Sequence, residues 1–210
     1  MTKPVTGLTM GILADRGLWR PDDAVADHLP ELRNLRVATG FDDRGAPILA
    51  DPVHPPRDWS APPAAAMGGM GLVSTIGDYA RFAQLLLDRG EWHGRRIVSA
   101  ESVTAQMSNQ LPEPLLEHGF HVGHMDLRPG FGYGYGYNGA VFHDPALAGS
   151  PVGRGTYQWD GAAGTWFWAD PEHDLLYIGM IQLLSYAAPP LQKITQALLA
   201  DAILDPGTPS

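Results

Sequence analysis

The chain contains no cysteine among its 210 residues. Disulfide bonds and thiolate metal sites are therefore excluded, and the sequence gives no information on the redox state of the compartment. No apolar run approaches the roughly 18 residues that a membrane-spanning helix needs. The first residues, Met1–Pro4, have no resemblance to a signal peptide. We therefore predict a cytoplasmic protein without a membrane span.

Clusters of basic residues are also missing. Lys and Arg together number 14 against 23 Asp and Glu, so the formal net charge is −9. Because binding of phosphate groups depends on clustered Lys and Arg, this balance argues against nucleic acid as a partner. The glycine-rich stretch Met67–Gly71 is not followed by the Lys and Ser or Thr of a phosphate-binding loop. We expect no cofactor.

The composition that remains is that of one folded domain. Apolar residues make up 44% and charged residues 18%, which is enough for a packed core. The 25 Gly and 19 Pro predict many turns. Asp51–Ala66 carries five of the prolines and little periodicity. We interpret it as a join between segments that were once further apart, within a single domain over residues 1–210.

Apolar residues at helical spacing predict several helices. One covers Lys3–Arg16, with Gly17 as the residue that ends it and little chain ahead to cap it. A second begins at Thr75, where Asp78 stands three residues on in capping-box order, and closes at Gly90. Further helices are predicted from Ser99 to about Asn109, with Val103 and Met107 inward, and over Pro190–Leu204 with an apolar stripe of Leu191, Ile194, Leu198, Leu199 and Ile203.

The stretch from Tyr157 to Gln182 has the pattern of a β-hairpin. Thr165–Trp168 is aromatic and β-branched, Asp170–Asp174 is rich in turn residues, and Leu175–Ile181 is a second apolar run. Ahead of it, the small residues of Trp159–Gly164 allow another group to approach the backbone closely. Two interpretations stay open for this segment: a strand edge that builds an oxyanion site, and an ordinary strand with a glycine bulge.

Other segments predict further strands. Short strands are expected over Asn34–Thr39 and Ala46–Ala50, around Glu91–Val98, and over Phe131–Tyr137, which Asn138-Gly139 ends in a turn. Leu111–Pro129 is expected to be a loop. The order of elements predicts an α+β fold in which helices pack on an antiparallel sheet.

Three histidines of the predicted loop, His118, His121 and His124, are spaced by three residues. Such histidines can gather on a metal ion in a loop that contains glycine, but no carboxylate or cysteine stands at a matching interval. We expect solvated histidines and no metal site.

Three segments together resemble the β-lactamase-related serine hydrolases, which include class C β-lactamases, penicillin-binding DD-peptidases and esterases. They are Met1–Thr6, the stretch Gly69–Thr75 with Asp78–Phe82, and Trp159–Trp168. The resemblance covers most of the chain and implies an incomplete β-lactamase/transpeptidase-like fold that lacks a central helical segment.

The resemblance also implies roles for particular residues. Lys3 matches the lysine of the family's Ser-x-x-Lys motif, in which the amine activates the serine hydroxyl, and that serine would directly precede Met1. No counterpart of the family's Tyr-x-Asn motif is found.

The third motif of the family falls on Trp159-Asp160-Gly161, which implies contacts with the substrate. It also implies that the backbone N–H of Ala162 is an oxyanion donor. Asp160 departs from the usual small residue, and its carboxylate would repel a substrate that carries a carboxylate.

Two functions follow from this reading. The first is hydrolysis of a small-molecule ester or amide through an acyl-enzyme. The second is a remnant or binding fold without chemistry. We expect the chain as given to be inactive. Loss of the central helices would expose apolar surface, which predicts poor solubility.

Overall fold

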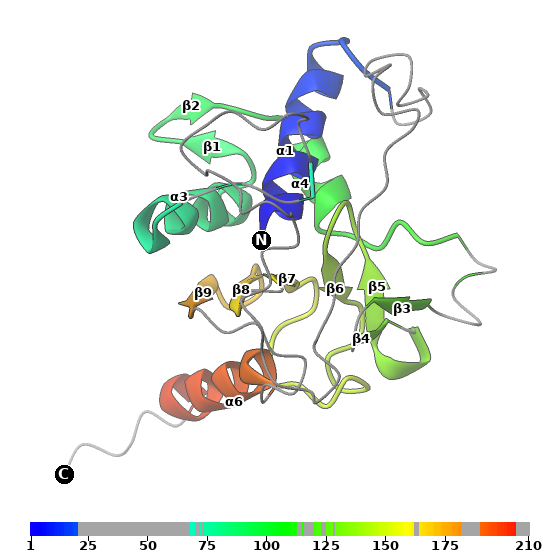
Figure 1. Ribbon diagram of the computed structural model, residues 1–210, viewed down its shortest axis with the longest axis vertical. Coiled ribbons are helices and arrows are strands. Elements are labelled where there is room, and N and C mark those ends of the chain that lie inside the picture. Colours follow the sequence, from blue (N-terminus) through cyan, green and yellow to red (C-terminus); the bar gives the residue numbers. More distant parts are fainter. Residues whose placement is uncertain are drawn as a thin grey trace, which may run out of the picture.

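A five-stranded antiparallel sheet lies at the centre of the molecule (Figure 1). The computed structural model describes residues 1–20, 68–69, 72, 74–112, 115, 120–122, 125–127, 129–161, 164–181 and 190–204. The strands follow the order β5-β6-β7-β8-β9, so that each pairs with its neighbour in sequence. Their bounds are Tyr133–Tyr135, Ala140–Phe142, Tyr157–Gly161, Thr165–Asp170 and Leu175–Met180.

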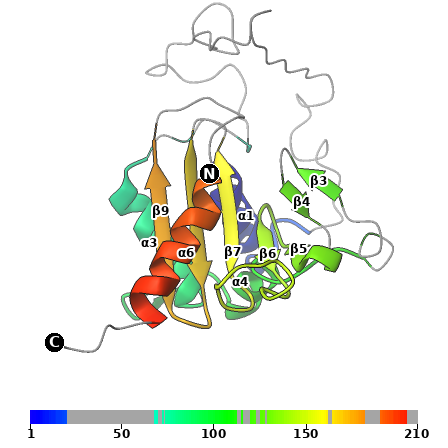
Figure 2. The same cartoon turned by 90° about the horizontal axis from the view of Figure 1, so that it is seen from below.

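Helices cover both faces of the sheet (Figure 2). One face carries α1 (Thr2–Asp15), α3 (Ile76–Leu87) and α4 (Ala100–Gln106), and the other carries α6 (Leu191–Leu204). The main apolar core lies on the first of these faces, where the ring of Tyr79 meets that of Phe167 edge-on at 5.1 Å. The predicted α+β class, with helices flanking an antiparallel sheet, is confirmed.

The predicted hairpin is formed by β8 and β9, and β7 adds a third strand before it. Asp174 in the β8–β9 turn has a φ of 53°, in the left-handed region that Asp tolerates. Between β7 and β8 the chain turns at Gly164, whose N–H donates to Gly161 O at 2.9 Å. Asn138, with a φ of 61°, links β5 to β6, as its Asn-Gly pair predicts.

The helix ends follow their local signals. At the end of α1 the N–H groups of Gly17 and Leu18 donate to Ala14 O and Leu13 O, at 2.9 and 3.0 Å. This pair of bonds is a Schellman motif, and Gly17 takes the required positive φ of 68°. At its start, α1 has Met1 as its N-cap residue, which makes no side-chain cap.

The N-termini of α3 and α4 are both capped as predicted. Thr75 Oγ1 accepts from Asp78 N at 3.1 Å, and Ser99 Oγ accepts from Ser102 N at 3.0 Å. The carboxylate of Asp15 also accepts from Ser99 N at 2.7 Å, so the last residue of α1 caps α4 as well. Helix α4 ends at Gln106, before the predicted Asn109, with Val103 and Met107 buried.

Several predicted boundaries are wrong. Glu91–Val98 forms a two-stranded hairpin, β1 (Glu91–Trp92) with β2 (Arg95–Arg96), and the predicted loop contains a hairpin of β3 (Phe120–Val122) with β4 (Met125–Leu127). Strands of two or three residues are too short to show alternation in sequence. Phe131 lies in a 3₁₀ turn, Pro129–Phe131.

Other predictions lie outside the described residues: the strands over 34–39 and 46–50, the Pro-rich join over 51–66, and with it the single-domain prediction. Within the described parts of the chain, no helix has the length and apolar character to cross a membrane.

Helix α6 begins at Leu191, one residue after the predicted Pro190, and ends at the predicted Leu204, but only part of its predicted apolar stripe faces inward. Ile194 and Leu198 are 41% and 62% exposed, whereas Gln196 is 2% exposed. The reason is that this face of the sheet offers polar partners: Gln196 Nε2 donates to Gln158 Oε1 of β7 at 2.9 Å.

Candidate active site

The start of α1 meets the end of β7, although 159 residues separate them. The Met1 amine donates to Asp160 O at 3.3 Å. A Cβ on Gly161 would stand 3.0 Å from the Met1 nitrogen and would overlap Thr165 Oγ1. Only glycine therefore permits this approach, which agrees with the expectation that small residues here admit another group to the backbone.

Lys3 lies in the first turn of α1, beside this junction. Its ammonium donates to Gly69 O at 3.4 Å and its side chain is exposed. Thr6 Oγ1 also donates to Gly68 O at 2.7 Å, because residues three and four apart share one face of a helix. Gly68 and Gly69 are thus held against the face of α1 that carries Lys3.

The Met1 amine is influenced by two charged side chains, those of Lys3 and Asp160. Burial lowers the pKa of this amine, the Lys3 ammonium lowers the pKa further, and the Asp160 carboxylate raises it. Lys3 and Asp160 are therefore both close enough to act on the same atom. The structure brings together Lys3, Asp160 and Gly161.

Tyr79 fixes the first turn of α1 from the side of α3. Its hydroxyl donates to Met1 O at 2.9 Å, and the residue is 5% exposed. Burial raises the pKa of Tyr79, so the phenol stays protonated and remains a donor. This role has no signal in the sequence, because a tyrosine on an apolar helix face carries no sign of a polar partner.

Gln106 is a second residue near the site that sequence reasoning missed. Its Nε2 donates to Pro4 O of α1 at 2.9 Å and to Tyr157 Oη of β7 at 3.3 Å. The available signal is its spacing: Gln106 stands three residues after Val103 and one before Met107, so it belongs to the inward face of α4.

The remaining predicted site residues are placed as follows. The ring of Trp159 is 5% exposed and lies in the core, 5.7 Å from that of Tyr135, so only its backbone is available to a ligand. Ala162, His118 and His124 lie outside the described residues, and of His121 only the backbone in β3 is described. In the described parts of the chain, no three His, Asp or Glu side chains gather in a way that could hold a metal ion.

The arrangement therefore supplies the Lys3 amine on the first turn of α1, a turn whose Met1 nitrogen contacts the glycine end of β7. An amine so placed can accept a proton from a neighbouring hydroxyl, and a strand end can present backbone N–H groups to a carbonyl oxygen.

Comparison with known proteins identifies the family. Residues 33–202 match the family model described as Beta-lactamase. The chain belongs to the beta-lactamase family. This confirms the resemblance to the β-lactamase-related family. The match includes the glycine-rich segment and the third-motif strand, whereas Lys3 lies before it.

The curated relatives of this family member come from Mycobacterium tuberculosis. Protein Rv1367c, of strain ATCC 25618 / H37Rv, is 38% identical over 135 residues, which are 63% of this chain and 32% of that protein. The uncharacterized protein MT1414 of strain CDC 1551 / Oshkosh matches to the same extent. The matched part of the chain thus spans about a third of the length of these relatives.

Solved structures confirm the fold. Unliganded simvastatin synthase from Aspergillus terreus, as its selenomethionyl derivative, superposes with a TM-score of 0.51 and 19% identity, over 97% of this chain and 50% of that chain. A mutant of the same enzyme gives a TM-score of 0.50 and 23% identity, over 64% of this chain and 36% of that chain. The incomplete β-lactamase-like fold is therefore confirmed.

Proposed function

We propose that this chain belongs to a serine hydrolase that cleaves a small-molecule ester or amide through an acyl-enzyme. The observation that carries the proposal is the contact between the Lys3 turn of α1 and the Asp160–Gly161 end of β7. Membership of the beta-lactamase family supports it.

The reaction has two steps, and the serine directly before Met1 is its nucleophile. The serine oxygen attacks the substrate carbonyl while Lys3 accepts the hydroxyl proton, and that proton then passes to the departing alcohol or amine. Water next attacks the acyl-serine, which releases the acid and restores the serine. The N–H groups of Ala162 and the serine hold the negative oxygen in both steps.

The position of Lys3 is compatible with this role. Its bond to Gly69 O, at 3.4 Å, is long for a hydrogen bond to a carbonyl, and the side chain is exposed. Turning the amine toward a serine hydroxyl would therefore cost little free energy, because the hydrogen bond that is lost is weak. Asp160 favours substrates without a carboxylate near the reacting carbonyl, because two carboxylates repel.

A second function is a binding fold without chemistry. Two contacts support it: the Lys3 amine donates to Gly69 O, and the Thr6 hydroxyl donates to Gly68 O. Both groups are thus used in contacts with the backbone. We therefore expect the 210-residue chain itself to form no acyl-enzyme.

A serine-directed fluorophosphonate probe, read by intact mass, separates the two functions. The chain is compared with one extended by Met-Ser before Met1 and with a matched Met-Ala extension. We expect added mass only on the Met-Ser form. In that form Lys3→Met should slow labelling at least ~100-fold, since a positioned base contributes about 10²–10⁴. Lys193→Met, on the exposed side of α6, is the control.

Labelling of the unextended chain would overturn the assignment of the nucleophile. A folded Met-Ser form that takes no label would favour the binding fold. The intact mass of the protein from its native cells gives an independent test. The hydrolase proposal expects a mass well above the 22.6 kDa of this chain.

A further inference from the structure

The contact between α6 and the sheet is polar and leaves a small cavity. The cavity has a volume of about 30 Å³, and its wall includes Trp168, Asp170, His173, Gln196, Leu199 and Ala200. It lies at the end of the sheet opposite Gly161, at the Asp170 end of β8. It is therefore separate from the candidate active site.

One buried donor in the cavity wall lacks a protein partner. The indole Nε1 of Trp168 is buried and has no hydrogen-bond acceptor among the described residues. Trp168 as a whole is 2% exposed. Buried N–H groups in folded proteins are nearly always paired with protein or ordered water, so this one points to an acceptor other than the described residues.

The neighbouring indole shows how the same interface satisfies such a group. Trp166 Nε1 donates to Thr195 Oγ1 of α6 at 3.3 Å. Trp168 lies two residues further along the same face of β8, and its ring stacks with that of Tyr177 at 6.0 Å. Both tryptophans thus lie in the contact between β8 and α6. Of the two indoles, only that of Trp166 donates to a hydroxyl of the described residues.

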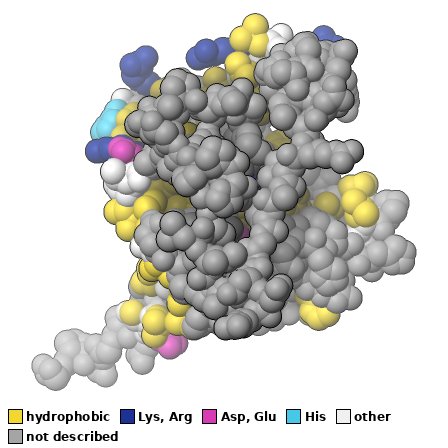
Figure 3. Space-filling model, in the orientation of Figure 1, with side chains coloured by type: hydrophobic (Ala, Val, Ile, Leu, Met, Phe, Trp, Pro, Cys, Tyr) yellow, Lys and Arg dark blue, Asp and Glu magenta, His cyan; other side chains and the backbone are white. Residues whose placement is uncertain are grey.

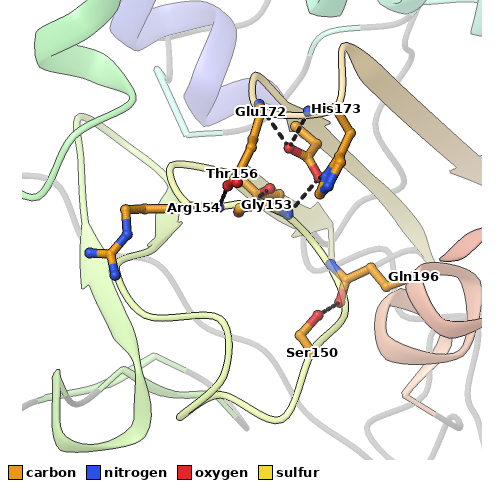
Figure 4. A network of polar contacts seen from close by, with 8 residues as sticks. Ser150, Gly153, Arg154, Thr156, Glu172, His173 and Gln196 are labelled. Carbon is orange, nitrogen blue, oxygen red and sulfur yellow. Dashed lines mark hydrogen bonds and ion pairs between the residues drawn. The ribbon is translucent and has the colours of Figure 1, made fainter. Parts of the chain in front are cut away.

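The carboxylate of Asp170 cannot serve as the missing acceptor. Its Oδ1 accepts from Glu172 N at 3.0 Å and His173 N at 3.2 Å. Its Oδ2 accepts from Gly153 N at 2.7 Å and lies 2.9 Å from His173 Nδ1 (Figure 4). A carboxylate has about four acceptor positions, and these four contacts use them.

Gln196 retains one acceptor position. Its Oε1 accepts from Ser150 Oγ at 3.1 Å, as Figure 4 shows, while its Nε2 donates to Gln158. A carbonyl oxygen has two lone pairs, so one remains. Trp168 and Gln196 both line the cavity, and between them they offer one unpaired donor and one unused acceptor position.

We propose that the cavity binds one ordered water molecule, which accepts from Trp168 Nε1 and donates to Gln196 Oε1. A volume of about 30 Å³ is enough to hold a water molecule. The water joins β8 to α6 and completes the polar contact that holds this helix on the sheet.

Nuclear magnetic resonance tests this directly on the 15N-labelled chain. The Trp168 indole N–H signal is assigned from its loss in Trp168→Phe. We expect a cross peak between this proton and water, with opposite sign in the NOE and ROE spectra, which marks a long-lived bound water rather than exchange. The Trp166 indole should show none.

A matched pair of variants in α6 locates the water. Ala200→Leu fills the cavity and should remove the Trp168 cross peak, whereas Ala202→Leu, on the exposed side, should keep it. No cross peak in the wild type, or one unchanged in folded Ala200→Leu, would overturn the proposal. If Ala200→Leu fails to fold, the wild-type spectra decide alone.

Discussion

At the scale of single residues, the buried amide of Gln106 joins three elements beneath the candidate site. It is 1% exposed and donates from α4 to Pro4 O of α1 and to Tyr157 of β7. Tyr157 in turn donates to Tyr137 O at 2.7 Å. This one side chain therefore sets how the Lys3 turn of α1 lies relative to β7.

We expect Gln106→Leu to lower the free energy of unfolding by about 1–3 kcal/mol, because it removes buried hydrogen bonds and leaves acceptors unpaired. Urea denaturation of the two proteins measures the difference. Gln110→Leu is the matched control, since Gln110 is exposed and its change should stay within about 0.5 kcal/mol. Equal losses in both variants would contradict a special role for Gln106.

At the scale of elements, the pairing of β8 with β9 depends on a glycine. Gly179 stands opposite Trp166, and a Cβ there would overlap the indole ring. The same ring stacks with Tyr177 at 6.1 Å. Trp166 thus occupies the space above Gly179, and the strand has no room for a larger residue at this position.

We expect Gly179→Ala to destabilise the protein by about 1–3 kcal/mol through overpacking, although alanine loses less chain entropy on folding than glycine. Thermal and urea unfolding measure whether the free energy of unfolding falls or rises. Gly130→Ala is the control, because nothing lies within 4 Å of a Cβ at that position. A Gly179→Ala protein as stable as the wild type would show that Trp166 can move at little cost.

At the scale of the whole molecule, the described surface carries apolar side chains on two adjoining elements. Strand β9 is the last of the sheet, has six residues without charge or proline, and is half-buried. Ile194 and Leu198 of α6 are exposed. Figure 3 shows hydrophobic side chains along the margin where Figure 1 places β9 and α6. Uncharged outer strands and apolar patches promote association.

We therefore expect the chain to self-associate as its concentration rises, in line with the poor solubility predicted from sequence. Leu198→Lys should reduce association measured by light scattering, because it removes an apolar side chain that is 62% exposed. Ala197→Lys adds the same charge at an exposed neighbour and should reduce it less. A monomer that melts sharply and reversibly at every concentration would contradict this expectation.

Local signals were sufficient for the starts of α3 and α4, the end of α1 and the hairpin of β8 with β9. The caps at Thr75 and Ser99 and the Schellman turn at Gly17 depend on residues within five positions, so they are readable from sequence. The family was also readable, because the segments Gly69–Thr75 and Trp159–Trp168 that resemble it are short and contiguous. The hairpin of β3 with β4 was not, because its strands are too short to show a period.

The sequence by itself determined where the main helices and the hairpin of β8 with β9 form and to which family the chain belongs, because both depend on neighbouring residues. Only the tertiary structure decided that Met1 meets Asp160, that Gln106 links α1 to β7, and that α6 turns Gln196 inward and Leu198 outward. Which face of an element is buried depends on the partner it meets, and these partners lie 38 to 159 residues away in the chain.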